Sequence, residues 1–466
     1  MYEYKTKPFE HQRQALILGA EKKVFAYLME MGTGKTKVSI DNAAYLYQLG
    51  EISLCVVIAP NSVYQNWKDE IHTHCPSETH IFTYKIDKHF AFDEGKLNFL
   101  LMNVEAFSHK SGVSFLSKIL DYYGKKTMMI VDESTTIKNR TAKRTKSLMK
   151  LGDKVTYRRI LTGSPITKSP LDLFSQFQFL QKGILGTDNF FVFRAKHCVM
   201  RDITNTSGRR VSIPVSYINL EGLETKVKEH SYRTLKKDCL DLKPKVYTRR
   251  YVNLLSDQAE AYKELKDHAR TVINDDTVTF NNKLAEIIKL MQLTSGFYKS
   301  DTGEVKDLPS AKLNELLNVI EETSGKIIIW SHYIRTLENI IETLKTKYGT
   351  DSTVAFYGDT DTVKRPGIIQ SFQNDDKVRF FVGNPQSAGF GLNLTEANTV
   401  IYFSNSFNLE ERQQSEDRAH RAGQTGSVLY VDIVARNTID EYILKSLQNK
   451  IQISAKTLGE EILDFL

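Results

Sequence analysis

Short, mostly apolar runs alternate with stretches of helical periodicity along the first part of the chain. The runs lie at residues 24–28, 54–60, 99–103, 126–131 and 157–161, and a helical pattern follows the first of them from 37 to 49. Runs of this length and composition are typical of strands that are buried on both faces of a parallel sheet. The alternation therefore predicts βαβ units and an α/β fold.

The same alternation returns in the last third of the chain, after a different middle. Apolar runs recur at residues 326–330, 353–356, 378–382, 399–403 and 428–431. Between the two parts, residues 171–250 and 257–293 have helical patterns, and the polar segment 294–310 contains glycines and a proline, which predicts a linker or hinge. We therefore predict a first lobe at 1–252, with a helical insertion at about 171–250, and a second lobe at 253–466.

Composition favours a folded protein with a polyanionic partner. The chain has 466 residues, of which 41% are apolar, so two or three packed domains are expected. Its formal net charge of +7 makes nucleic acid the leading candidate partner, although charge alone does not identify one.

Cysteine spacing and apolar runs bear on the compartment. The four cysteines are far apart in sequence and include no Cys-x-x-Cys pair, which disfavours a zinc site or a disulfide framework and suits a reducing cytosol. The first residues lack the apolar core of a signal peptide, and no run is long enough to span a bilayer. We expect a cytoplasmic protein with no membrane partner.

A glycine loop, residues 31–36, separates the first apolar run from the first helical pattern. It consists of Met31, Gly32, Thr33, Gly34, Lys35 and Thr36. Glycines let backbone N–H groups turn toward a nucleotide's β-phosphate, Lys35 supplies a compact positive charge, and the Thr36 hydroxyl can ligate Mg²⁺. The full phosphate-loop pattern requires a glycine where this chain has Met29, so a glycine turn of another kind remains the alternative.

Two adjacent carboxylates, Asp132 and Glu133, follow the apolar run 126–131. The carboxyl edge of a parallel sheet is where ligands bind in open α/β folds. There Asp132 would hold Mg²⁺ and Glu133 would orient the water that attacks the γ-phosphate of ATP. A strand that ends in two solvated acids is the other interpretation. The polar turn at 162–165 follows the next run and can either sense the phosphate state or simply cap a helix.

Arg418 and Arg421 provide further candidate catalytic charge. They are three positions apart, so on a helix both guanidinium groups would project from one face, which suits a phosphate. An arginine supplied by the second lobe can stabilise phosphoryl transfer only when the lobes close. A surface helix that pairs its arginines with nearby acids is the alternative.

Together, these segments resemble the Swi/Snf-related ATPases, the double-stranded-DNA translocases of helicase superfamily two. The resemblance is carried by motif I (30–36), Ia (59–67), II (132–135), III (161–166), IV (330–333), V (387–395) and VI (414–424). The run at 417–424 is highly specific to this family. The similarity covers almost the whole chain. It implies two RecA-like parallel-sheet lobes in tandem, with helical insertions between them.

The resemblance also implies roles for individual residues. It implies that the protein uses ATP with Mg²⁺, with Lys35, Asp132, Glu133, Arg418 and Arg421 as catalytic residues. Gln12 would read the adenine, and Gly391 and Gln414 would join the glycine loop in binding nucleotide. Polar contacts to DNA would come from Asn61, Ser62, Ser331 and Asn393. Ser134 and Thr135 stand where many relatives have Ala-His, so this chain lacks the histidine that would couple motif II to motif III.

A basic strip follows motif II. Lys138, Arg140, Lys143, Arg144, Lys146 and Lys150 lie in a stretch without an acid between them. Such a strip can track DNA phosphates without sequence preference, whereas a solvated helix face is the alternative. We favour DNA contact, with Lys143 and Arg144 among the contacting residues.

These features lead to one principal hypothesis. ATP binding closes Arg418 and Arg421 onto the γ-phosphate, hydrolysis reopens the cleft, and each cycle moves one lobe along duplex DNA. A strand-separating DNA or RNA helicase and an ATP-controlled DNA clamp or loading partner are the two alternatives. The short insertions resemble compact bacteriophage, prophage or bacterial versions, whose partners would be phage or host replication or recombination proteins.

Overall fold

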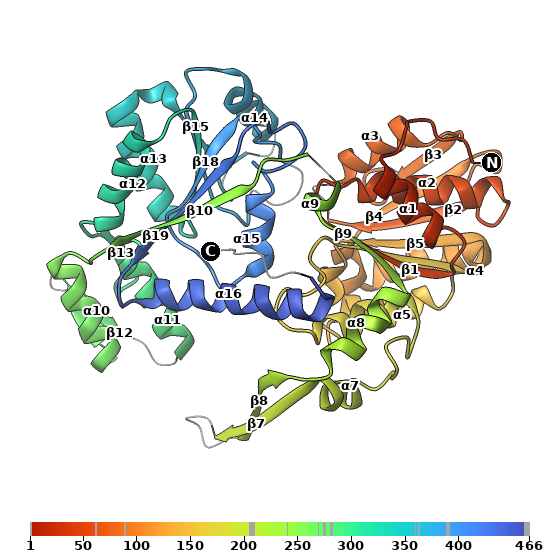
Figure 1. Cartoon of the computed structure of the whole chain (residues 1–466), viewed down its shortest axis with the longest axis horizontal. Coiled ribbons are helices and arrows are strands. Elements are labelled where there is room, and N and C mark those ends of the chain that lie inside the picture. The colour runs from red at the N-terminus through yellow and green to blue at the C-terminus, as the bar shows by residue number, and fades with distance from the viewer. Residues whose placement is uncertain are drawn as a thin grey trace. The chain divides into compact units, whose positions relative to one another are not determined.

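The computed structural model describes most of the chain, which folds into two compact units (Figure 1). It describes residues 2–60, 63–87, 90–204, 210–239, 241–268, 270–273, 276–279, 283–358, 360–361, 364–387 and 392–460. Within these residues, unit 1 comprises 2–241 and 452–460, and unit 2 comprises 242–451.

Unit 1 is built on a parallel sheet of seven strands among the described residues, in the order β3-β4-β2-β5-β6-β1-β9. The strands are β1 (Val24–Met29), β2 (Leu54–Ala59), β3 (Thr79–Thr83), β4 (Leu97–Asn103), β5 (Thr127–Asp132), β6 (Tyr157–Leu161) and β9 (Ser231–Thr234). Alternate side chains of β1 enter different apolar cores: Phe25 and Tyr27 enter one core, and Ala26 and Leu28 the other. Burial on both faces explains why the central strands are almost uniformly apolar in sequence.

Helices pack on both faces of this sheet. The described helices of unit 1 are α1 (Glu10–Gly19), α2 (Lys35–Gln48), α3 (Tyr64–His74), α4 (Lys110–Tyr123), α5 (Lys143–Gly152), α6 (Asp172–Leu180), α7 (Phe190–His197), α8 (Leu220–Glu229) and α9 (Lys236–Cys239). Arg159, fully buried on β6, donates to the carbonyls of Gly19 and Ala20 at 2.9 and 3.2 Å and to Asn42 Oδ1 at 2.9 Å. These bonds satisfy the C-terminal carbonyls of α1 and fix this helix beside the sheet.

A two-stranded ribbon, β7 (Cys198–Thr204) and β8 (Arg210–Tyr217), projects from unit 1 (Figure 1). The helical pattern predicted for residues 171–250 is therefore wrong for this segment. The ribbon contains β-branched residues that favour extended backbone, including Ile203, Val211 and Ile213, and all three are exposed.

Unit 2 contains a second parallel sheet, with six described strands in the order β10-β19-β18-β15-β17-β16. Its strands are β10 (Lys245–Val252), β15 (Lys326–Trp330), β16 (Thr353–Phe356), β17 (Phe380–Gly383), β18 (Ala397–Tyr402) and β19 (Val428–Ala435). Its helices are α10 (Ser256–His268), α11 (Lys283–Thr294), α12 (Ala311–Glu322), α13 (Ile334–Tyr348), α14 (Arg365–Asn374), α15 (Leu409–Glu416) and the first part of α16 (Ile439–Leu458). The predicted fold class, two parallel α/β lobes in tandem, is confirmed.

Three details differ from the sequence-based expectation. The predicted boundary after residue 252 lies beyond β10, which pairs with β19 in the sheet of unit 2. The predicted helix 257–293 is interrupted by a hairpin of β11 (Arg270–Ile273) and β12 (Asp276–Thr279). The predicted linker 294–310 contains the hairpin β13 (Phe297–Lys299) and β14 (Val305–Asp307), whose Tyr298 is 1% exposed, so this segment packs as part of unit 2.

None of the helices in the described part of the chain combines the length and apolar character that a membrane span requires.

Candidate functional site

The glycine loop connects β1 to the N-terminus of α2, as predicted. Gly32 and Gly34 have φ values of 82° and 84°, a left-handed backbone that glycine adopts without strain. The Thr33 N–H and hydroxyl both donate to the Glu30 carbonyl, at 3.2 and 2.7 Å. Because α2 begins at Lys35, the loop lies at a helix N-terminus, where backbone N–H groups and the helix dipole favour an anion.

Gln12 lies directly against this loop. Its Nε2 donates to the Thr33 carbonyl at 3.2 Å, and its Oε1 accepts from the Phe9 N–H at 3.0 Å. A Cβ added to Gly34 would lie 2.1 Å from Gln12 Nε2, so only glycine leaves room for this contact. The structure thus brings Gln12 to the glycine loop, while adenine reading remains a prediction.

Asp132 and Glu133 lie at the carboxyl end of β5. Trp67 Nε1 donates to Asp132 Oδ2 and the Glu133 N–H donates to Asp132 Oδ1, both at 2.9 Å. Burial raises the pKa of Asp132, and the Trp67 hydrogen bond, the charge of Lys35 and the Glu133 N–H oppose that rise. Because Lys35 acts electrostatically on Asp132, the fold brings the glycine loop and the acid pair together.

Glu133 has a strained backbone, with φ 46° and ψ 63°. A non-glycine residue in this left-handed region costs about 1–3 kcal/mol and persists only where its surroundings hold it. The short 3₁₀ helix Ser134–Ile137 follows immediately. The strain therefore lies at the residue predicted to orient the attacking water.

The polar turn at 162–165 packs on the glycine loop. A Cβ added to Gly163 would lie 2.9 Å from the Met31 backbone nitrogen. Arg233, on β9, donates to the carbonyls of Gly163 and Leu28 at 2.8 and 3.1 Å. The turn is therefore held between β1, β9 and the glycine loop, which is more than a simple helix cap requires.

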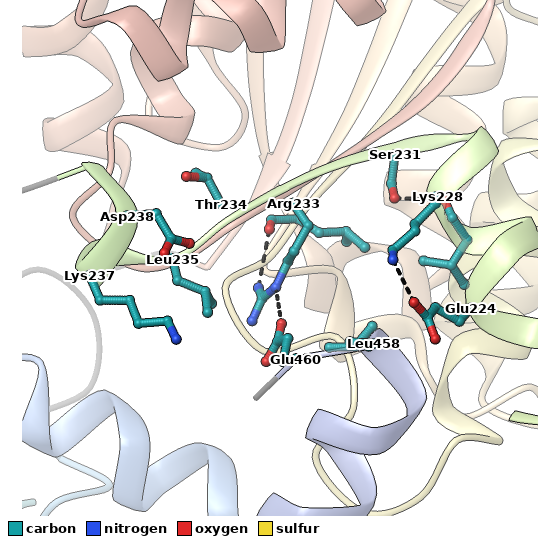
Figure 2. Close-up of a pocket in the computed structure, with 13 residues that line it drawn as sticks. Glu224, Lys228, Ser231, Arg233, Thr234, Leu235, Lys237, Asp238, Leu458 and Glu460 are labelled. Carbon is teal, nitrogen blue, oxygen red and sulfur yellow. Dashed lines mark hydrogen bonds and ion pairs between the residues drawn. The ribbon is translucent and has the colours of Figure 1, made fainter. Parts of the chain in front are cut away.

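Arg233 also lines a cavity of about 420 Å³ in unit 1. Figure 2 shows Arg233 directed toward Glu460, with which it forms an ion pair, while Lys228 on α8 pairs with Glu224. None of the predicted site residues lines this cavity. The candidate site consequently rests on the contacts around the glycine loop and the acid pair.

The two arginines of motif VI do not share a helical face, so that expectation is wrong. Helix α15 ends at Glu416, with Asp417 as its C-cap, and residues 417–421 form a turn. Arg418 is 2% exposed, whereas Arg421 is half-buried and its Nη1 donates to the Leu392 carbonyl at 3.0 Å. The two guanidinium groups therefore have different surroundings within unit 2.

The other predicted residues have varied surroundings. Gln414 is half-buried on α15, and Asn393 is exposed. Ser331, predicted to contact DNA, is fully buried beside Ser404, with 3.2 Å between the hydroxyl oxygens, so a surface contact does not fit this conformation. Asn61, Ser62 and Gly391 lie outside the described residues.

A buried charge network near motif VI was missed in the sequence. Arg412 binds Glu416 Oε1 at 2.8 Å and Asp432 Oδ1 at 2.6 Å, and Lys245 Nζ lies 2.9 Å from Glu416 Oε2. Burial by itself would raise the pKa of Glu416, but Lys245 and Arg412 outweigh it and lower the pKa to about 2. The i, i+4 spacing of Arg412 and Glu416 was a signal for one pair, whereas the partners on β10 and β19 required the fold.

Five of the six residues of the basic strip form two groups. Lys143, Lys146 and Lys150 are exposed on α5. Arg144 Nε donates to the Thr136 carbonyl at 3.0 Å, and Lys138 Nζ donates to Thr167 Oγ1 at 2.7 Å. The first group is free to meet a partner, while the second is engaged in contacts within the fold.

The fold and the site define a two-lobed RecA-like protein whose first lobe carries a phosphate-type glycine loop. Residues 25–299 match the SNF2-related domain, and residues 311–423 match the helicase conserved C-terminal domain. The chain belongs to the SNF2-related family.

Curated relatives cover nearly all of this chain. It is 28% identical over 443 residues to an uncharacterized ATP-dependent helicase of Mycoplasma genitalium, which covers 93% of this chain and 40% of that protein. It is 29% identical over 458 residues to one of Mycoplasma pneumoniae (96% and 41%), and 26% identical over 441 residues to the DNA annealing helicase and endonuclease ZRANB3 of Bos taurus (92% and 38%). The chain thus spans about two-fifths of the length of these relatives.

A solved structure of the Sulfolobus solfataricus SWI2/SNF2 ATPase core in complex with dsDNA is similar to this chain at 24% identity and a TM-score of 0.45. The match covers 98% of this chain and 95% of that one.

Proposed function

We propose that the chain is an ATP-driven motor that moves along double-stranded DNA. Membership of the SNF2-related family supports this proposal. The single observation that carries the chemistry is that the charge of Lys35 acts on Asp132, which lies next to the strained Glu133. It combines a phosphate-binding charge, an acid that loses solvation and a water-orienting carboxylate, which are the parts that ATP hydrolysis needs.

In this proposal the residues of unit 1 bind and orient the nucleotide. Lys35 and the loop N–H groups bind the phosphates, and Gln12 reads the adenine. Thr36 and Asp132 would hold Mg²⁺, an ion that one hydroxyl and one carboxylate suit. The chemistry that this ion would supply is neutralisation of phosphate charge. Glu133 orients the attacking water.

Unit 2 contributes the arginines in this proposal. Arg421, which is half-buried, supplies positive charge to the γ-phosphate, while the burial of Arg418 favours a role in holding the 417–421 turn. Gln414 and Gly391 complete the nucleotide contacts. These assignments extend the resemblance of motifs V and VI to this chain.

For DNA, we propose backbone contacts without sequence preference. The exposed Lys143 and Lys146 on α5 and the net charge of +7 support phosphate binding. Asn393, which is exposed, and Asn61 and Ser62 are further candidates. A compact bacterial, prophage or bacteriophage form, working with replication or recombination proteins, stays our prediction, and two of the matched relatives are bacterial.

The decisive experiment measures ATP hydrolysis at low salt with duplex DNA, single-stranded DNA, RNA or no nucleic acid. Strong stimulation by blunt duplex DNA, followed by displacement of a third strand from a long duplex, is expected. The Glu133→Gln variant should still bind ATP but lose hydrolysis by about 10²- to 10⁴-fold, because an amide cannot act as the base. Hydrolysis that does not depend on Glu133 contradicts the proposal, and stimulation without strand displacement favours the clamp.

The β7–β8 ribbon favours strand separation as a second candidate function. Its exposed Ile203, Val211 and Ile213 provide an apolar surface of the kind that wedges between base steps. Unwinding of tailed duplexes that is lost in an Ile203→Ser/Ile213→Ser variant, with ATP hydrolysis retained, would support it. Absence of unwinding by the unmodified protein excludes it.

A further inference from the structure

One buried glutamine, Gln176 on α6, joins two segments of the candidate site. Its Oε1 accepts from the Ser134 hydroxyl at 2.7 Å, and its Nε2 donates to the Pro165 carbonyl at 2.8 Å. Both Ser134 and Gln176 are fully buried. Water therefore does not substitute for either bond in the folded protein.

The two ends of this connection lie beside Glu133 and beside the glycine loop. Ser134 directly follows Glu133, whose left-handed backbone must be held by its surroundings. Pro165 ends the turn in which Gly163 packs on the backbone of Met31 in the glycine loop. The Gln176 side chain thus connects the acid pair to the glycine loop through the 162–165 turn.

Gln176 is itself held in place. Its Nε2 also donates to the Asp172 carbonyl at 2.8 Å, one turn earlier on α6. Asp172 Oδ2 accepts from the N–H groups of Thr167 and Lys168 at 3.0 and 2.7 Å, which fixes the start of α6 to the loop that follows Pro165. A side chain fixed by these bonds cannot shift to follow its neighbours. Its own position therefore determines where the residues bonded to it lie.

We propose that Gln176 is a positioning residue for Glu133, and that Ser134 is the contact through which it acts. This inference rests on the proposed ATP hydrolysis at the acid pair. Two apolar side chains would pack the same space without the cost of burying polar groups, so packing alone does not require this pair. The hydrogen bonds instead fix the direction of the turn that carries Glu133, and small displacements of a reacting group have large effects on rate.

The test replaces the pair together. The Ser134→Ala and Gln176→Leu single variants leave a buried polar partner unsatisfied, so each loses stability toward urea. The double variant removes the Ser134–Gln176 bond from both sides and should recover the stability that its unsatisfied half costs, while the Pro165 carbonyl loses its Gln176 partner as it does in Gln176→Leu. If Gln176 positions Glu133, the double variant still hydrolyses ATP about 10- to 100-fold more slowly, with its KM for ATP changed less than threefold.

A purely structural role gives the opposite result, since recovery of stability would then restore kcat as well. A stable double variant with the turnover of the unmodified protein overturns the proposal. Turnover is expressed per nucleotide-binding site, titrated with a fluorescent ATP analogue, so that unfolded protein does not count as loss of catalysis.

Gln178→Leu is the matched control on the same helix. Gln178 is also buried and bonds the Thr187 carbonyl and the Gly183 N–H, away from both turns. It should lower stability and leave turnover per site unchanged; an equal loss of turnover in this control would overturn the specific role of Gln176. Absence of Glu133-dependent hydrolysis in the unmodified protein would instead refute the proposed function itself.

Discussion

Gly163 lies so close to the glycine loop that the absence of a side chain is part of the site. A Cβ would lie 2.9 Å from the Met31 nitrogen, a distance at which backbone must move. We expect Gly163→Ala to weaken ATP binding about tenfold, because the displaced loop no longer fits the phosphates. Titration with a fluorescent ATP analogue measures this effect.

The matched control is Gly222→Ala, on α8 of the same unit. No atom lies within 4 Å of a Cβ added at Gly222, and the residue is exposed. This variant should bind the analogue normally. Equal affinities for Gly163→Ala and the unmodified protein would show that the 162–165 turn can accommodate the added methyl group without displacing the glycine loop.

Glu416 makes the stability of unit 2 depend on pH. Its pKa falls from 4.5 to about 2 on folding. Above pH 4.5 it is ionised in both states and its stabilisation is complete. Between pH 4.5 and 2 the unfolded chain takes up the proton first, so the stabilisation is lost as the pH falls through this window.

We therefore expect Glu416→Gln to destabilise unit 2 by about 3 kcal/mol at pH 7, from the size of the shift. The difference from the unmodified protein should shrink below pH 4.5 and nearly vanish at pH 2. Urea unfolding at several pH values checks this expectation. A difference that is constant across the window would mean that Glu416 contributes through packing rather than charge.

At the scale of elements, α5 presents the clearest surface for DNA. Lys143, Lys146 and Lys150 are exposed, whereas the Arg144 side chain is bonded to the Thr136 carbonyl and its loss would disturb the fold. We expect Lys143→Glu/Lys146→Glu to weaken duplex binding and to lower the ratio of DNA-stimulated to unstimulated hydrolysis. The slope of log affinity against log salt should fall by about 0.9 for each lost phosphate contact.

Two control variants show whether the effect on DNA binding is specific to the lysines of α5. Lys143→Gln/Lys146→Gln removes the charge without reversing it and should have a smaller effect. Exposed lysines outside α5, such as Lys182 and Lys228, supply a charge-reversal control. Equal weakening by both reversals would mean that net charge, not α5, attracts the DNA.

The sequence predicted well those strands whose own residues are apolar enough to show that the strand is buried. The runs at 326–330 and 353–356 coincide with β15 and β16, because an apolar run buried in a parallel sheet needs no other information. Strand β10 was missed because its exposed and half-buried positions include Arg249 and Arg250. Its partner β19 lies far along the chain, so only the fold reveals the pairing.

The candidate site divides in the same way. The ends of β1 and β5 located the glycine loop and the acid pair, since ligands gather at the carboxyl edge of a parallel sheet. The contacts that hold these residues were not predictable. Ser134 and Gln176 are 42 positions apart, and only the packing of α6 brings them together.

At the scale of the whole molecule, α16 belongs to both units. Its first part contributes Ile443 and Leu447 to the core of unit 2, whereas Leu458 is 6% exposed in the core of unit 1. We expect Leu458→Ala to lower the free energy of unfolding of unit 1 by about 2–4 kcal/mol, through lost burial and a cavity. Unit 2 should be affected much less.

The two tryptophans allow each unit to be observed separately. Trp67 is buried in unit 1 and Trp330 in unit 2. In a Trp330→Phe background, fluorescence during urea unfolding reports unit 1, and this replacement removes no hydrogen bond, because the Trp330 N–H has no partner within the described structure. In this background, a urea transition of unit 1 that Leu458→Ala leaves unchanged would contradict the assignment of this segment to unit 1.

The return of residues 452–460 to unit 1 also sets the timing of folding during synthesis. A ribosome adds about 5–20 residues per second, so the whole of 242–451 is made before the segment that contains Leu458 and Glu460. For on the order of ten seconds or more, the nascent first unit has an open apolar site where Leu458 will pack. Most of the unit 2 core can form in that interval, apart from the part to which α16 contributes Ile443 and Leu447, so the unit that is begun first is not finished before unit 2 has been made.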